Sequence, residues 1–109
     1  MDDNDVDLDK DDLIDVKEEV LSIQFLYYPL GQCLRLRLAD LRSICDAYPS
    51  ESDTERALED VLLLWLNQKY NTDKFGPPTW RQLVEAVDRK GGGNNHQLAK
   101  EIASKHPTG

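Results

Sequence analysis

The chain has 109 residues and a formal net charge of −8, and 31% of its residues are charged. This length supports one hydrophobic core but not two, so we expect a single domain. No apolar run is long enough to cross a bilayer, and the aspartate-rich N-terminus does not resemble a signal peptide. We therefore expect neither membrane insertion by this segment nor secretion.

The acidic charge is concentrated at the N-terminus. Residues 1–15 contain eight aspartates and one lysine, whereas residues 16–109 contain thirteen acidic and twelve basic residues. We expect residues 1–10 to form an acidic flexible tail and residues 11–107 to form the folded domain. The nearly neutral body argues against broad binding of nucleic acid, which requires a basic surface.

The cysteines and aspartates do not predict a metal site. Cys33 and Cys45 lie in apolar helical patterns, which favours reduced, partly buried thiols in an intracellular protein. No third and fourth zinc ligands lie at suitable spacing. The alternating aspartates near the N-terminus do not complete a calcium loop, because Lys10 stands where that loop needs glycine. We expect no metal and no other cofactor.

The first half of the chain predicts three helices. The first begins near Asp11 or Asp12, since acidic residues suit the positive end of a helix dipole. The apolar stretch 23–28 either extends this helix or packs irregularly. Pro29 suits the first turn of the second helix, and the third covers roughly Ala39–Ala47. Apolar residues at helical spacing are expected to face the core: Leu13, Val16, Val20, Leu21, Leu30, Cys33, Leu34, Leu41, Ile44 and Cys45.

A fourth helix is predicted from the residues after Pro49. Ser52 or Asp53 can cap it, and Glu55 completes a capping box with Ser52. We expect the helix to continue to about Tyr70. It is apolar nearly all round, which is typical of a helix at the centre of a bundle. Its predicted inner stripe consists of Leu58, Val61, Leu62 and Trp65.

Two shorter helices are predicted to follow. Thr79 is expected to cap the fifth, with Gln82 as its reciprocal capping partner. The glycines at 91–93 stop this helix and form a flexible link, and Asn95 caps the sixth. The expected inward residues are Trp80, Leu83, Val84, Val87, Leu98, Ala99 and Ile102.

Catalysis is not predicted for any part of the chain. His96 and His106 are the two histidines, and neither has a nucleophile paired with it in the sequence. Trp65 and Trp80 occur in phase with leucines, so we expect them in the core rather than as stacking platforms for a ligand. We therefore expect a non-enzymatic protein.

The order and residue types of these segments resemble the death domain family. The resemblance covers about residues 11–107 and implies a six-helix antiparallel bundle with Greek-key topology. It also implies homotypic assembly with other death-domain proteins, in the cytoplasm or on the cytoplasmic side of a larger receptor, in apoptotic or innate-immune signalling. The segments that carry it are Leu30-Gly31-Gln32-Cys33-Leu34-Arg35-Leu36, Asp40-Leu41-Arg42-Ser43-Ile44, Leu62-Leu63-Leu64-Trp65-Leu66, Thr79-Trp80-Arg81-Gln82-Leu83-Val84-Glu85-Ala86-Val87 and the residues from Asn94 to Ile102.

Two charged clusters are the candidate interaction sites. Arg35, Arg37 and Arg42 surround the second and third predicted helices. The acidic cluster lies on the first and fourth. These charges either form a mixed, solvated surface or dock against each other between copies. The resemblance implies the second, because death domains place their second and third helices against the first and fourth of the next copy. The other hypothesis is a helical nucleic-acid-binding domain that uses the three arginines. The acidic cluster consists of Glu18, Glu19, Glu55 and Glu59.

Overall fold

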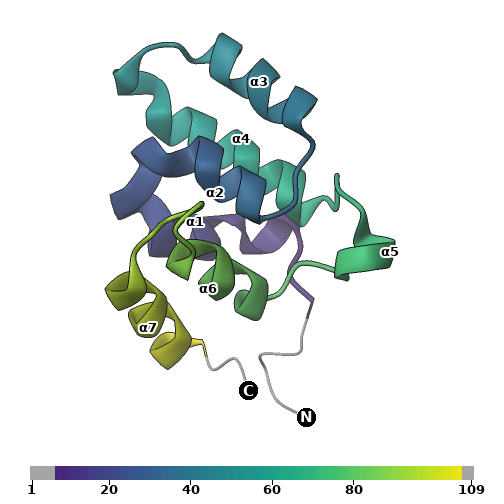
Figure 1. Ribbon diagram of the computed structural model, residues 1–109, viewed down its shortest axis with the longest axis vertical. Coiled ribbons are helices and arrows are strands. Elements are labelled where there is room, and N and C mark those ends of the chain that lie inside the picture. The colour runs from purple at the N-terminus through teal and green to yellow at the C-terminus, as the bar shows by residue number, and fades with distance from the viewer. Residues whose placement is uncertain (1–6, 107–109) are drawn as a thin grey trace.

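The computed structural model describes residues 7–106, and within that range the fold is all-α (Figure 1). The prediction of a six-helix bundle is confirmed. A seventh, single-turn helix, α5 (Thr72–Phe75), precedes the last two helices, and 3₁₀ turns cover Lys10–Asp12, Leu21–Leu26 and Glu51–Asp53. The six longer helices are α1 (Leu13–Val20), α2 (Tyr27–Cys33), α3 (Leu38–Ala47), α4 (Thr54–Leu66), α6 (Trp80–Asp88) and α7 (His96–Lys105).

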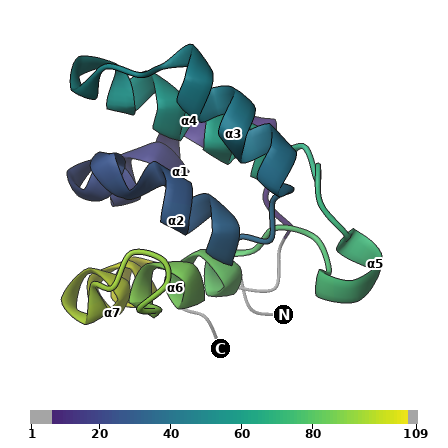
Figure 2. The same ribbon diagram turned by 45° about the horizontal axis from the view of Figure 1, so that its top comes forward.

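Helix α4 lies at the centre of the packing, as its apolar composition predicts. It contacts α1, α2 and α3, and Figure 2 shows three tiers in which α3 and α4, α1 and α2, and α6 and α7 lie one above another. The side chains of Leu58, Val61, Leu62 and Trp65 are completely buried. Trp80 is also buried, so both tryptophans pack in the core as predicted.

The apolar stretch between the first two helices forms a 3₁₀ segment that joins them without a loop. Its backbone bends at Ile23, where φ is −115° and ψ is 30°. The bend buries Ile23 and Tyr27 and leaves Phe25 66% exposed. Pro29 occupies the first turn of α2 as predicted.

Two of the predicted helix caps are present, and a third is wrong. The side chain of Thr79 accepts a hydrogen bond from the backbone N–H of Gln82, and that of Asn95 caps α7. At α4, however, the hydroxyl of Ser50 accepts from the backbone N–H of Ser52 and caps a 3₁₀ turn. The extended backbone at Ser50 brings its hydroxyl onto this turn. The helix then begins without a side-chain cap, so the capping box of Ser52 and Glu55 does not form.

Helix α4 ends at Leu66, earlier than the predicted end near Tyr70. Gln68 adopts a left-handed conformation with φ of 60°, and the N–H of Lys69 donates to the carbonyl of Leu64. This turn reverses the chain and returns the side chain of Tyr70 to the core, where it is 6% exposed. Burial of an aromatic ring outweighs the gain from one further helical turn.

The folded part begins earlier than the predicted boundary near residue 10. Leu8 is buried, and its backbone N–H donates to the carbonyl of Pro78 at 2.8 Å. Asp9 and Asp12 then form a reciprocal capping box around the first 3₁₀ turn. Residues 7–10 are therefore part of the domain and not of a flexible tail. The predicted tail residues 1–6 lie outside the described range.

The cysteines differ from each other in exposure. Cys33 is half-buried, but Cys45 is exposed and does not face the core as predicted. The reason is the position of α3, which lies at the edge of the bundle against α2 and α4 (Figure 1). At such an edge only a narrow stripe is covered, and within α3 it consists of Leu41 and Ile44.

The glycines that connect α6 to α7 pack tightly and do not form a loose link. Gly92 and Gly93 are buried, and the N–H of Gly93 donates to the carbonyl of Ala86 at 3.0 Å. A Cβ at Gly92 would overlap the carbonyl oxygen of Ala86, and one at Gly93 would lie 2.6 Å from that of Val87. Glycine is needed here for close approach of two backbones.

Candidate functional site

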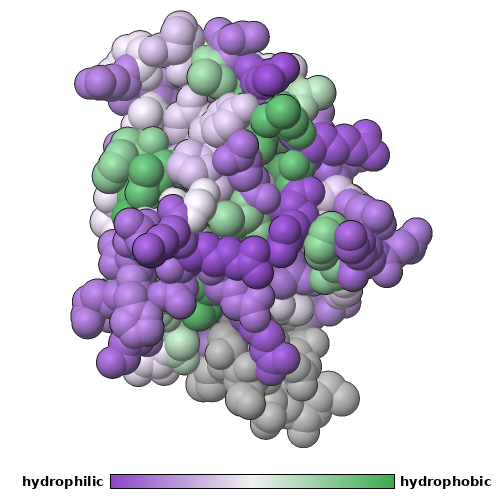
Figure 3. Space-filling view, viewed as in Figure 1, coloured by the Kyte–Doolittle hydropathy of each residue, from purple (hydrophilic) through white to green (hydrophobic). Residues whose placement is uncertain are grey.

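The three predicted arginines all lie at the surface around the start of α3. Arg35 and Arg37 belong to the link between α2 and α3, and Arg42 lies on α3 itself. Each is exposed. Figure 3 shows that the surface near the start of α3 combines hydrophobic and hydrophilic groups. Arg35 and Arg42 border different hollows, however: Arg35 lies beside Phe75, and Arg42 lies beside Tyr28.

Arg35 is held in a specific backbone conformation. Its φ is 72°, and it follows α2 at the position where a glycine commonly ends a helix. The N–H groups of Arg35 and Leu36 donate to the carbonyls of Gln32 and Gly31, which satisfies the end of the helix. The guanidinium lies 4.8 Å from the ring centroid of Phe75, within cation–π range. Arg35 is therefore oriented both by its backbone conformation and by its contact with the ring of Phe75.

The two predicted interaction residues on α4, Glu55 and Glu59, are already paired within the chain. The ammonium group of Lys17 on α1 lies 3.1 Å from a carboxylate oxygen of Glu59 and 4.0 Å from one of Glu55. Lys17 is half-buried between them. This pairing joins α1 to α4, and it neutralises part of the charge that the sequence predicts as free.

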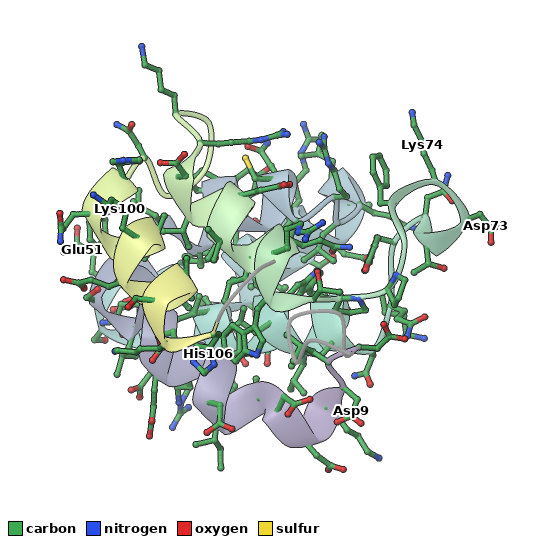
Figure 4. All side chains as sticks on the ribbon, turned by 90° about the horizontal axis from the view of Figure 1, so that it is seen from below. Asp9, Glu51, Asp73, Lys74, Lys100 and His106 are labelled. Carbon is green, nitrogen blue, oxygen red and sulfur yellow. The ribbon has the colours of Figure 1, made fainter. Side chains whose placement is uncertain are left out.

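Glu19 points away from the α4 acids and toward the end of α7, so the predicted acidic cluster is divided. Its carboxylate lies 3.5 Å from Nζ of Lys105 and 3.9 Å from Nε2 of His106, and its side chain is only 12% exposed. Figure 4 shows His106 where α7 ends. Glu18, by contrast, is exposed on α1. The outward-facing acid of the first helix is therefore Glu18 and not Glu19.

Gln82 is the centre of a polar network that connects α4, α5 and α6. Its amide nitrogen donates to the carbonyls of Phe75 and Pro77, at 3.0 and 2.7 Å. Its amide oxygen accepts from Nε1 of Trp65 at 3.3 Å and from the hydroxyl of Tyr70 at 3.5 Å. The side chain is thus fully used and is not the reciprocal capping partner that the sequence predicts. Burial raises the pKa of Tyr70 to about 12, although the bond to Gln82 acts in the opposite direction.

A groove between α3 and α4 was not predicted from the sequence. Ile44, Leu63 and Leu64 line it, and the carboxyl groups of Asp40 and Asp60 stand beside them. The signal that could have indicated it is the unbroken leucine run in α4. A helix that is apolar nearly all round, in a small domain, leaves part of its apolar surface uncovered.

The helices described here are all too short or too polar to span a bilayer. No model of a known protein family matches the chain, and no curated protein and no solved structure matches it either.

Proposed function

We propose that this chain is a non-enzymatic protein-interaction domain of the death-domain type, which assembles with copies of itself or with similar domains in cytoplasmic signalling. The observation that carries the proposal is the exposed basic edge of Arg35, Arg37 and Arg42, separate from the acids of α1 and α4. The resemblance of the helical segments supports the same conclusion. Opposite charges on different faces favour head-to-tail contact between copies.

The chemistry of such contact is electrostatic attraction followed by exclusion of water. Guanidinium groups at the start of α3 attract carboxylates of the next copy and orient it before close contact forms. The resemblance implies Glu18, Glu19, Glu55 and Glu59 as the acidic partners, and of these Glu19 lies against the end of α7. Added salt should weaken the association, because exposed charges are screened over about 8 Å at physiological ionic strength.

Sedimentation velocity across protein concentration tests the proposal. We expect the wild type to self-associate at low salt, Arg37→Glu to weaken association, and an equal mixture of Arg37→Glu with Glu59→Arg to recover part of it. Lys100→Glu and Glu101→Arg are matched controls, because both positions are exposed on α7. Circular dichroism confirms that each variant is folded.

A wild-type protein that stays monomeric at high concentration and low salt contradicts self-assembly. Equal weakening by Arg37→Glu and Lys100→Glu contradicts the placement of the contact at the start of α3.

A further inference from the structure

Helix α3 presents two chemically different stripes to its surroundings. Leu38, Arg42 and Cys45 recur at helical spacing along one side, and all three are exposed. Asp40 and Ile44 recur along another side, where the groove with α4 lies. Positions i and i+4 share one side of a helix. The stripe that contains Arg42 and the stripe that contains Asp40 therefore face away from each other.

The groove between α3 and α4 has an apolar floor and an acidic rim. Its volume is about 350 Å³, which is at the lower end of the range for binding sites of small groups. We call its apolar lining, Ile44, Leu63 and Leu64, the floor and its acidic lining, Asp40 and Asp60, the rim; Ser43, Asn67 and Lys69 complete the lining. A floor and rim of this kind fit an aliphatic side chain that carries a positive charge beside it.

The two rim carboxylates lack a salt-bridge partner among the described residues, unlike Glu55 and Glu59 on α4. A hydrogen bond to Asp60 raises the pKa of the Tyr48 hydroxyl. Lys69 also lines the groove, and its single positive charge offsets only part of the negative charge of the two aspartates. Glu59, the neighbour of Asp60 in the sequence, is already paired with Lys17 at 3.1 Å.

Leu38 has the properties of a group that fits this groove. It is 44% exposed at the first residue of α3, and Arg37 precedes it directly. Arg42 follows one helical turn after Leu38. Among the described residues it makes no salt bridge, not even with Asp46 one turn further along. The other exposed large apolar side chains in the described part are Ile14 and Phe25. Figure 3 shows hydrophobic surface beside the start of α3, bordered by hydrophilic groups.

We propose that the groove between α3 and α4 binds the start of α3 of a second copy of this chain. Leu38 of one copy fills the apolar floor of the next, and Arg42 pairs with Asp60 and Asp40 on the rim. The inference rests on the self-assembly proposed above and names its receiving surface. Because the two stripes face different ways on α3, the contact is heterologous, and each copy keeps one stripe free for a further copy.

Two matched pairs of variants test this contact in sedimentation and light-scattering experiments with the full chain. Asp60→Arg should weaken self-association at least tenfold, whereas Glu101→Arg, an acid-to-arginine change at an exposed position on α7, should leave it within about twofold. Leu38→Ser should weaken it to a similar extent, whereas Ile14→Ser, at a position that is 70% exposed, should not. A mixture of Arg42→Glu with Asp60→Arg should associate more strongly than either variant alone.

The outcomes separate this inference from the proposed function. If Glu59→Arg abolishes association and Asp60→Arg does not, the groove is not the receiving surface, but head-to-tail assembly stands. If the wild type is monomeric under all conditions, both proposals fail. Asp60→Asn is the second variant in case Asp60→Arg does not fold, and it should also weaken association by removing the charge. Unchanged association of a folded Asp60→Asn protein at low salt overturns the inference.

Discussion

The imidazole ring of His106 stacks on the indole ring of Trp80, with ring centroids 3.7 Å apart and planes inclined by only 7°. This contact joins the end of α7 to the start of α6. Near it, the carboxylate of Glu19 on α1 approaches both His106 and Lys105. The last helix is therefore fixed at its end by an aromatic contact and by the carboxylate of Glu19.

The stacking predicts a measurable contribution of His106 to stability. His106→Ala should lower the free energy of unfolding by about 0.5–1.5 kcal/mol, the range for aromatic pairs. Urea unfolding followed by circular dichroism measures it. Gln97→Ala is the control, since Gln97 is exposed on the same helix. Equal effects of the two substitutions would show that the ring contact adds nothing.

The network around Gln82 should be sensitive to loss of its amide. In Gln82→Ala the indole N–H of Trp65 and the carbonyls of Phe75 and Pro77 lose this partner. We expect destabilisation of about 1–3 kcal/mol, because unsatisfied buried polar groups retain their desolvation penalty. Gln97→Ala, at an exposed position on α7, should change stability by less than about 0.5 kcal/mol. Identical melting temperatures of the two variants would contradict the network.

The left-handed backbone at Arg35 makes a prediction with a defined sign. Both Arg35→Gly and Arg35→Ala remove the contact with Phe75. Arg35→Gly also relieves the strain of the left-handed backbone, whereas Arg35→Ala retains that strain. The glycine variant should therefore be more stable than the alanine variant by about 1 kcal/mol, the lower end of the cost of a left-handed residue. Thermal unfolding of both proteins decides this. Gln68, with φ of 60°, should show the same order of stability for glycine and alanine.

Burial of Leu8 predicts that the N-terminal segment stabilises the domain. Leu8→Ala should lower the free energy of unfolding by about 2–5 kcal/mol, as for other buried leucines. Leu38→Ala, at a 44% exposed position, should cost much less in monomeric protein. Chemical unfolding at low protein concentration compares the two. Wild-type stability of Leu8→Ala would restore the boundary near residue 10.

Two tyrosines predict a loss of stability in alkaline solution. Burial raises the pKa of Tyr27 and of Tyr70 to about 12, whereas an unfolded tyrosine titrates near pH 10. Deprotonation between about pH 10 and 12 therefore favours the unfolded state, and stability that is fully present below pH 10 is lost as the pH rises through 12. Tyr70→Phe should show a shallower decline over this window in urea unfolding at several pH values. An unchanged slope would contradict the assignment of the effect to Tyr70.

The local signals in the sequence predicted much of the bundle. Thr79 and Asn95 were predictable as caps because each side-chain oxygen bonds to a backbone N–H only three residues further along the chain. Trp65 was placed in the core from helical phase alone. The predicted end of α4 near Tyr70 was wrong, because the left-handed backbone at Gln68 returns Tyr70 to the core. This turn depends on a distant partner: the hydroxyl of Tyr70 donates to the carbonyl of Gly76 across a loop.

The candidate site was harder to predict from the sequence, because the charge of a residue does not show where its side chain points or which residue it pairs with. Glu19 and Glu59 belong to helices that the sequence placed correctly. Their carboxylates nevertheless point to different neighbours, His106 and Lys17. Such choices depend on how helices cross, and helical periodicity does not contain this information. The role of Gln82 was missed for the same reason, since its four partners all lie outside its own helix, between Trp65 and Pro77.

The close packing of Gly92 and Gly93 against the last turn of α6 has a consequence for how the molecule opens. The N–H groups of Gly92 and Gly93 donate to carbonyls of Arg89 and Ala86, so the connection continues the hydrogen bonding of the helix that it leaves. Helices α6 and α7 also pack closely against each other, so we expect them to open as one cooperative unit. Transient opening of the domain should release this pair as a whole, while the tiers around α4 remain closed.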